Sequence, residues 1–258
     1  MLLFLGAHNT ESRSTRMVSV VVDDVLALDA GSLTSSLSFL KQKRLKAVLL
    51  THQHHDHVRD LPALAMNFFL PQASLDVYAT LPVFETLKAS LFGGDLYPDF
   101  FEPRKGRRAL SFKRINLHEE VRIGDYSVLA VPVVQPVPAV GYQVKGRYGE
   151  TVFYTGDTAP GLYETWCHVS PHVLIVELTA SDRLGSSARE SGHLSPLLLR
   201  SELIAFKALK GYLPRGVAVH MDPDLESEIA RETEAVAREL GADIALAHEG
   251  MELDVTAP

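Results

Sequence analysis

Four histidines and an aspartate crowd into one short segment of the chain, Thr51-His52-Gln53-His54-His55-Asp56-His57. Alternate residues of an extended backbone point the same way, so His52 and His54 form one pair of ligands. Asp56 and His57 are adjacent and point apart, which offers a second pair. Imidazole and carboxylate groups suit zinc, iron or manganese. The alternatives are a solvated polar loop or a tag-like run, but this segment directly follows the apolar run Ala47-Val48-Leu49-Leu50.

The composition narrows the class of protein. The 258 residues are 46% hydrophobic and 22% charged, which is ordinary for a soluble globular protein. The net charge of −7 disfavours non-specific binding to nucleic acid. Cys167 is the single cysteine, so an internal disulfide is excluded and a reducing, cytoplasmic compartment is expected. No apolar run reaches the ~18 residues of a membrane span, and the N-terminus does not resemble a signal peptide.

Strands and helices alternate along the whole chain, without a low-complexity linker. Short runs rich in Val and Leu predict strands at 2–6, 17–22, 25–29, 47–51, 75–79, 110–115, 126–134, 141–144, 151–155, 172–178, 217–220 and 243–247, the last with a short partner at 251–255. Helical spacing predicts helices at 33–42, 61–70, 83–92, 196–209 and 225–240. Two halves, 1–120 and 121–258, each run from strands to helices. We expect one α/β domain, 1–258, with two sheets between helical layers.

Three more residues beside strands or helices could supply ligands. Asp157 follows a strand within Thr155-Gly156-Asp157-Thr158, although helix capping or a turn is the simpler explanation of this residue taken alone. His220 ends the strand that reads GVAV, where a loop histidine is the alternative. His193 precedes a helix within SGHLS, and helix entry alone would account for it.

An HxHxDH segment after an apolar strand, then GDT, then a late histidine at a strand end resembles the metallo-β-lactamase superfamily. The order and approximate spacing match over nearly the whole chain. The resemblance implies an αββα sandwich of two mixed sheets, with a metal site along the edge between them.

The C-terminal half resembles the class II cyclic-nucleotide phosphodiesterases within that superfamily. The segments FYTGDTAPGLYETW, LIVELT, ESGHLSPLLLRSEL and VAVHMDP carry the match through Gly156, Asp157, Thr158, Pro160, Trp166, Glu177, Gly192, His193, Leu194, Pro196, Leu199, Glu202, Leu203 and His220. The opening FLGAHNTESRSTRMVS and the turn VPAVGY also resemble tRNase Z and arylsulfatase-like relatives.

The resemblance implies two divalent metal ions, with zinc expected and manganese or iron as alternatives. The first ion would take His52, His54 and Asp157; the second would take Asp56, His57, Asp157 and His220. Gln135 stands where the family has a further histidine for the first ion. A glutamine carbonyl is a weaker, neutral ligand, so Gln135 or a water would complete that site.

The resemblance further implies a hydrolase in which water, activated to hydroxide by the ions and held beside Asp56, attacks a small cyclic-nucleotide-like phosphodiester. His193 would bind the phosphate or protonate the leaving group, and Glu177 would orient His193. The alternatives are a tRNA 3′-processing nuclease, a carboxylic ester or lactone hydrolase, a metal-binding protein with an impaired first site, and a mononuclear iron redox enzyme. A small-molecule partner is favoured over nucleic acid or a membrane.

Residues 93–108 form the least regular stretch, aromatic first and basic second. Arg104, Lys105, Arg107 and Arg108 could steer phosphate, although a solvated loop is the simpler interpretation. Tyr97, Phe100 and Phe101 could wall a substrate pocket, or instead provide packing or a homodimer contact.

Overall fold

Two seven-stranded sheets face each other in the computed structural model, which describes residues 1–103 and 108–255. In spatial order the first sheet contains β14 (Glu252–Leu253), β1 (Leu2–Gly6), β2 (Ser19–Val22), β3 (Leu26–Leu28), β4 (Ala47–Leu49), β5 (Leu75–Ala79) and β6 (Leu110–Arg114). The second contains β13 (Ile244–Leu246), β12 (Arg215–Val219), β11 (Val173–Glu177), β10 (Thr151–Tyr154), β9 (Val140–Lys145), β8 (Tyr126–Pro132) and β7 (Glu120–Ile123).

Each sheet is half antiparallel and half parallel. Strands β3 to β6 run parallel in the first sheet, and β10 to β13 run parallel in the second. The carboxyl ends of parallel strands meet at one edge of a sheet, which is where ligands bind in open α/β structures. Both sheets therefore offer such an edge.

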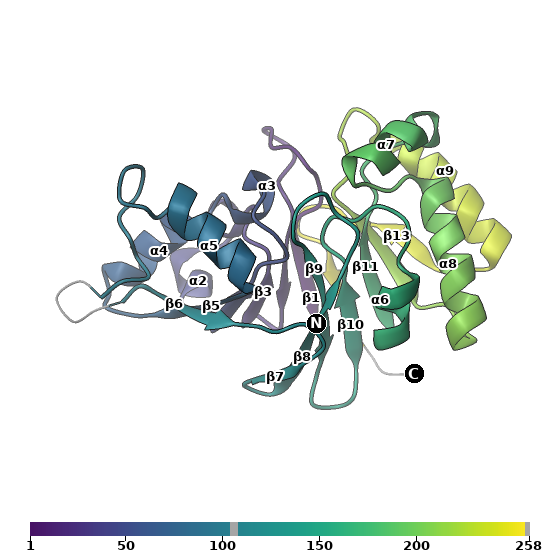
Figure 1. Ribbon diagram of the computed structural model, residues 1–258. Helices are drawn as coiled ribbons and strands as arrows, with labels where there is room; N and C mark the ends of the chain where they lie inside the picture. Colours follow the sequence, from purple (N-terminus) through teal and green to yellow (C-terminus); the bar gives the residue numbers. More distant parts are fainter. Residues whose placement is uncertain (104–107, 256–258) are drawn as a thin grey trace.

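Helices cover the outer face of each sheet (Figure 1). The first sheet is covered by α1 (Leu33–Ser36), α2 (Phe39–Gln42), α4 (Leu61–Phe69) and α5 (Leu81–Ser90), and the turn α3 (His55–Val58) lies near the centre. The second is covered by α6 (Tyr163–His168), α7 (Gly185–Ser191), α8 (Pro196–Lys210) and α9 (Glu226–Leu240). The predicted αββα sandwich is confirmed. Among the described residues, no helix is long and apolar enough to cross a membrane.

The period-two pattern of the strands explains the layers. On β2, Val20 and Val22 belong to the core between the two sheets, together with Tyr142 and Val144 of β9. Val21 points the other way, into the core under the helices of the first sheet. Strands that are apolar on both faces can be covered on both sides, and each fully buried Val or Leu contributes about 1.5–3 kcal/mol.

Two predicted elements differ in the structure. The single helix expected over 33–42 is broken at Leu37, which is extended with φ −99° and ψ 135°. Ser38 then caps a new helix by accepting from the Lys41 amide, so two one-turn helices replace the one expected. The partner strand expected at 251–255 pairs not with β13 but with β1 of the other sheet, where Leu253 lies opposite Leu2.

Two of the three aromatic residues named in the irregular stretch serve packing, whereas Tyr97 is 39% exposed. Phe100 and Phe101 are buried in the core under the helices, and the ring of Phe101 meets those of Phe84 and Phe92 edge to face. They do not wall a substrate pocket. Arg104, Lys105 and Arg107 of the basic run lie outside the described residues.

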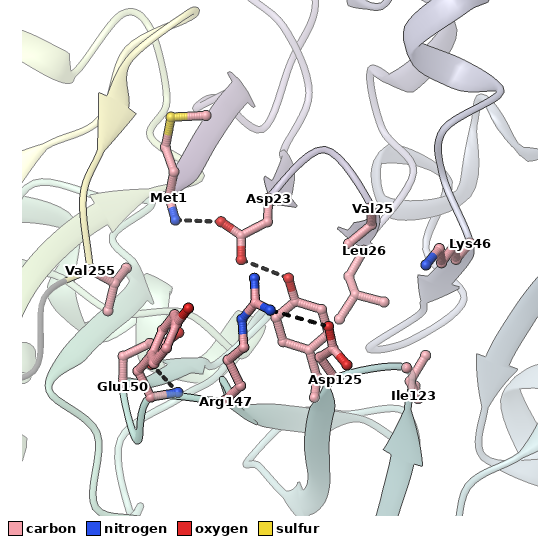
Figure 2. A pocket seen from close by; sticks show the side chains of 13 residues that line it. Met1, Asp23, Val25, Leu26, Lys46, Ile123, Asp125, Arg147, Glu150 and Val255 are labelled. Atoms are coloured by element: carbon pink, nitrogen blue, oxygen red, sulfur yellow. Dashed lines mark hydrogen bonds and ion pairs between the residues drawn. The ribbon is translucent and has the colours of Figure 1, made fainter.

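A polar cavity of about 510 Å³ lies beside Lys46, at one end of β4 (Figure 2). The histidine segment follows the other end of this strand. The Tyr126 hydroxyl of the second sheet donates to Asp23 of the first at 2.6 Å, and the Met1 amino group donates to the same carboxylate. Met1 is paired with Asp23, and Arg147 with Asp125, while the hydrogen bond between Tyr126 and Asp23 links the two sheets.

Glu202 of α8 anchors the loop that follows Asp157. Its buried carboxylate accepts from the amides of Gly161 and Leu162 at 2.7 and 3.1 Å, and from the Trp166 indole at 3.1 Å. The Trp166 ring packs edge to face on Phe153 and Phe206. A single carboxylate thus fixes both the loop and the helix after it.

Replacing this carboxylate by an amide should destabilise the fold. Glu202→Gln places an NH₂ group against N–H donors, and it replaces hydrogen bonds to a charged group, which are the stronger ones. We therefore expect the free energy of unfolding, measured with urea, to fall by about 2 kcal/mol. Glu239→Gln is the matched control, since Glu239 forms an exposed ion pair with Arg200 and should leave the midpoint nearly unchanged. Equal midpoints for the two variants would contradict this role of Glu202.

Candidate metal centre

Loops from both sheets bring the predicted ligands to one edge of the sandwich. The segment after β4 supplies His52, His54, Asp56 and His57, the turn after β10 supplies Asp157, and the end of β12 supplies His220. The donor atoms form two sets, each within 4.8 Å: Asp56, His57, Asp157 and His220; and His52, His54 and Asp157. These are the two sets that the sequence predicts.

Asp157 belongs to both sets. Its Oδ2 lies 3.6 Å from His52 Nε2, while its Oδ1 lies 3.1 Å from His57 Nε2 and 3.3 Å from His220 Nε2. One oxygen therefore faces each set, which is the geometry of a bridging carboxylate. Gly156 makes this turn feasible because its φ is +59° and a Cβ there would lie 2.8 Å from the Thr51 side chain.

The donor chemistry fits a divalent cation. His57 donates its Nδ1 proton to Asp29 at 2.7 Å, so in the neutral ring its Nε2 carries a lone pair that points toward Asp157. Within the described residues, His57 Nε2 and Asp157 Oδ1 are buried without a hydrogen-bond partner. Two lone pairs so close repel unless a proton or a cation lies between them. Nitrogen and carboxylate donors in sets of three and four suit zinc.

Electrostatics within the cluster are strong. Burial alone would lower the pKa of His57, but the carboxylates of Asp157 and Asp29 hold it well above the usual range. Burial, aided by the charge of His57, lowers the pKa of His52, so this imidazole is neutral. Burial opposes ionisation of Asp157, yet the neighbouring histidines His220 and His57 keep its pKa well below normal. The pocket is therefore built to hold positive charge.

Glu177 and His193 lie beside this cluster, as predicted. Glu177 is buried at the end of β11, and its Oε1 accepts from the Leu194 amide at 2.7 Å and lies 3.4 Å from His193 Nδ1. The His193 ring is partly exposed and stacks on His220 with centroids 5.4 Å apart. Burial would lower the pKa of His193, but the Glu177 carboxylate raises it.

Gln135 lies next to the turn that carries His193. A Cβ built on Gly192 would come within 1.9 Å of Gln135 Oε1, so the glutamine rests directly against that glycine. Its Oε1 is buried and without a hydrogen-bond partner among the described residues. A ligand role for Gln135 stays a prediction, because its side chain contacts Gly192 in the turn that carries His193.

Comparison with known proteins places the chain in a family. Residues 21–248 match the model described as the beta-lactamase superfamily domain, over most of the chain. The chain belongs to the metallo-β-lactamase superfamily. Its structure resembles those of YhfI from Bacillus subtilis (TM-score 0.76, 16% identity, 97% of each chain), unliganded yeast PDE1 (0.77, 17%, 97% and 99%) and the short form of human tRNase Z (0.71, 19%, 100% of each).

Curated members of the superfamily share shorter stretches with this chain. It is 30% identical over 135 residues to a hydroxyacylglutathione hydrolase of Nitrosomonas eutropha, covering 52% of this chain and 41% of that protein. It is 26% identical over 159 residues to ribonuclease Z of Thermococcus kodakarensis, covering 57% and 46%. The chain thus spans less than half the length of these two relatives.

Two residues that hold the metal-ligating side chains in place are not part of the sequence motifs. Asp29, fully buried after β3, accepts from the Thr51 amide and hydroxyl, from His57 and from the Tyr154 hydroxyl, all at 2.7 to 2.8 Å. Thr179 donates to Glu177 at 2.7 Å and lies 2.8 Å from His220 Nδ1. An aspartate that ends an apolar strand, and a threonine two residues after Glu177, are the signals that could have indicated them.

Asp29→Asn should weaken both the fold and the metal site. The amide cannot accept from all four donors, and it no longer fixes the tautomer of His57. We therefore expect the free energy of unfolding of the metal-free protein, measured with urea, to fall by about 2–3 kcal/mol. Tyr154→Phe removes one donor of the four and should cost about 1 kcal/mol. If the two variants unfold alike, Asp29 does not organise this site.

Thr179→Val should lower metal affinity with little change in shape. Thr179 donates its proton to Glu177, so it accepts from His220 Nδ1 and leaves Nε2 free as a ligand. We expect a 10–100-fold rise in the dissociation constant of one zinc ion, measured by competition with a chromogenic chelator. Thr179→Ser keeps the hydroxyl and should restore affinity; a serine variant as weak as the valine variant would contradict the role.

Proposed function

We propose that this protein is a metal-dependent phosphodiesterase that acts on a small nucleotide-like diester. It would use two divalent metal ions, and zinc is the expected metal. The observation that carries the proposal is the bridging position of Asp157, whose two oxygens face two separate donor sets. Two adjacent ions suit displacement at phosphorus because both the attacking and the leaving oxygens need stabilisation. The resemblance of the C-terminal segments to class II phosphodiesterases supports the same substrate class.

Each donor residue has a defined task in this proposal. His52, His54 and Asp157 would hold the first ion, and Asp56, His57, Asp157 and His220 would hold the second. When bound, such ions supply Lewis acidity that lowers the pKa of water toward ~7 and neutralises charge on phosphate oxygens. Asp56, which is half-buried, would accept a hydrogen bond from the attacking water and orient it.

His193 would serve as the proton donor. Its Nδ1 faces Thr179 and Glu177, which leaves Nε2 on the other side of the ring as the atom that donates to the leaving oxygen. Because its ring stacks on His220, a phosphate held by the second donor set would lie within its reach. Glu177 would fix the orientation of this ring.

A thioester or carboxylic ester is the rival substrate class. The specific observation in its favour is the stretch shared with a protein named hydroxyacylglutathione hydrolase. A metal-activated water can attack a carbonyl carbon as well as a phosphorus, so the donor sets alone suit both reactions. The substrate panel must therefore contain both.

Hydrolysis of a substrate panel by the zinc- or manganese-loaded protein tests the proposal. The panel contains 3′,5′-cyclic AMP, bis(4-nitrophenyl) phosphate and a glutathione thioester, with metal content measured on the same samples. We expect turnover of the diesters and a fall of more than about 100-fold in Asp56→Ala, since loss of a direct ligand should exceed the 10–100-fold of a supporting partner. Asp125→Ala, at the polar cavity on the far end of β4, is the matched control.

The outcomes separate the candidates. Turnover of cyclic AMP that Asp56→Ala abolishes and Asp125→Ala retains would support a nucleotide phosphodiesterase. Turnover of the thioester alone would overturn the proposal in favour of an ester hydrolase. Two bound metals without turnover of any substrate would also overturn it and favour a metal-binding role.

A further inference from the structure

A second cavity lies beside the metal centre rather than at the far end of the molecule. It measures about 620 Å³ and is formed by the start of α5, the end of β6 with the residues after it, and the β8–β9 connection. Leu81, Leu117 and Val137 line three of its sides, and it also contains four prolines, Pro82, Pro132, Pro136 and Pro138. We call it the proline groove.

Backbone contacts fix the proline groove next to the ligands. In the parallel pair of β4 and β5, Leu49 lies opposite Tyr78, so Thr51 and Thr80 leave the sheet side by side. The Val140 amide donates to the Thr51 carbonyl at 3.1 Å, directly before His52. At the other end of the connection, the Val134 amide donates to Thr158 Oγ1, directly after Asp157.

Gln135 links the groove to the proposed proton donor. It lines the groove, and its Oε1 rests against Gly192, the residue before His193. A substrate whose phosphate reached His193 would therefore have its substituent at the mouth of the groove. This link also gives Gln135 a place in the site that does not depend on metal ligation.

The lining is mostly apolar, with Thr80, Arg114, Asn116 and Gln135 as its polar members. Proline rings lose no rotamer freedom when a ligand is bound, so a groove with four of them is preorganised for a flat, rigid group. The volume lies within the range of small-molecule sites. Among the described residues, no carboxylate lines the groove, and Arg114 is its cation. Guanidinium groups stack on aromatic planes. An anionic substrate would meet no negatively charged side chain among these lining residues.

We propose that the proline groove binds the aromatic part of the substrate, a nucleobase or aryl group, of a diester whose phosphate lies at the metal centre. The inference rests on the proposed function for the position of the phosphate. The cavity in Figure 2 makes a contrast, because charged groups such as Met1, Asp23, Asp125 and Arg147 line it and it lies at the opposite end of β4 from the metal ligands.

Binding of two matched probes to the zinc-loaded protein tests the inference by calorimetry. Methyl phenylphosphonate and methyl methylphosphonate carry the same single charge and differ in the phenyl ring. We expect the phenyl probe to bind about tenfold more tightly, equivalent to about 1.4 kcal/mol. Val137→Trp fills the groove and should reduce the preference to within about threefold, with the affinity for the methyl probe and the metal content unchanged.

A second variant guards against misfolding. Leu117 is 44% exposed, so Leu117→Glu can be tolerated while placing a carboxylate on the groove wall, and it should also abolish the preference. Leu197→Glu is the matched control, because Leu197 is 54% exposed on α8 and does not line the groove, so this variant should keep the preference. The inference would be overturned if the unmodified protein showed no preference for the phenyl probe, or if both groove variants kept that preference. A preference that follows Val137 without any diester hydrolysis would retain the groove and reject the phosphodiesterase.

Discussion

The carboxylate of Asp29 is the interaction on which this site depends. It accepts four hydrogen bonds from groups in both sheets, because His57 and Thr51 belong to the first and Tyr154 to the second. A buried carboxylate without such partners would cost several kcal/mol. Fully satisfied, it holds the two sheet edges in register and turns the lone pair of His57 toward Asp157. The metal centre is thus a property of the sandwich as a whole.

A comparable arrangement supports the other side of the centre. Glu177 accepts from Thr179 and from the Leu194 amide, and these contacts orient His220 and the His193 turn. Each half of the molecule therefore contributes one buried acid behind its histidines, which is the usual support for metal-ligating imidazoles. Asp56 and Asp157 are the two acids that belong to the donor sets themselves, and Asp157 is buried between them.

Much of this could be predicted from the sequence, for identifiable reasons. His52, His54, Asp56 and His57 are neighbours in sequence, so their spacing alone predicts two donor sets, and alternating Val and Leu predict the strands. Asp29 and Thr179 could not be found in this way, because their partners are distant in sequence and each is an ordinary residue at a strand end. The break at Leu37 and the pairing of β14 with β1 were missed because both depend on tertiary contacts that override local pattern.

The pairing of β14 with β1 has a consequence for how the protein is made. On a ribosome, β1 emerges long before β14, so its outer edge stays open until residues 252–253 have been synthesised. The contact between Asp56 and His220 likewise spans 164 residues. Closing such long loops carries an entropic cost that late contacts must offset. The nascent chain therefore exposes an unpaired strand edge and an incomplete ligand set at the same time. The ligand set is completed when His220 has been synthesised, and the strand edge is covered later, when β14 arrives.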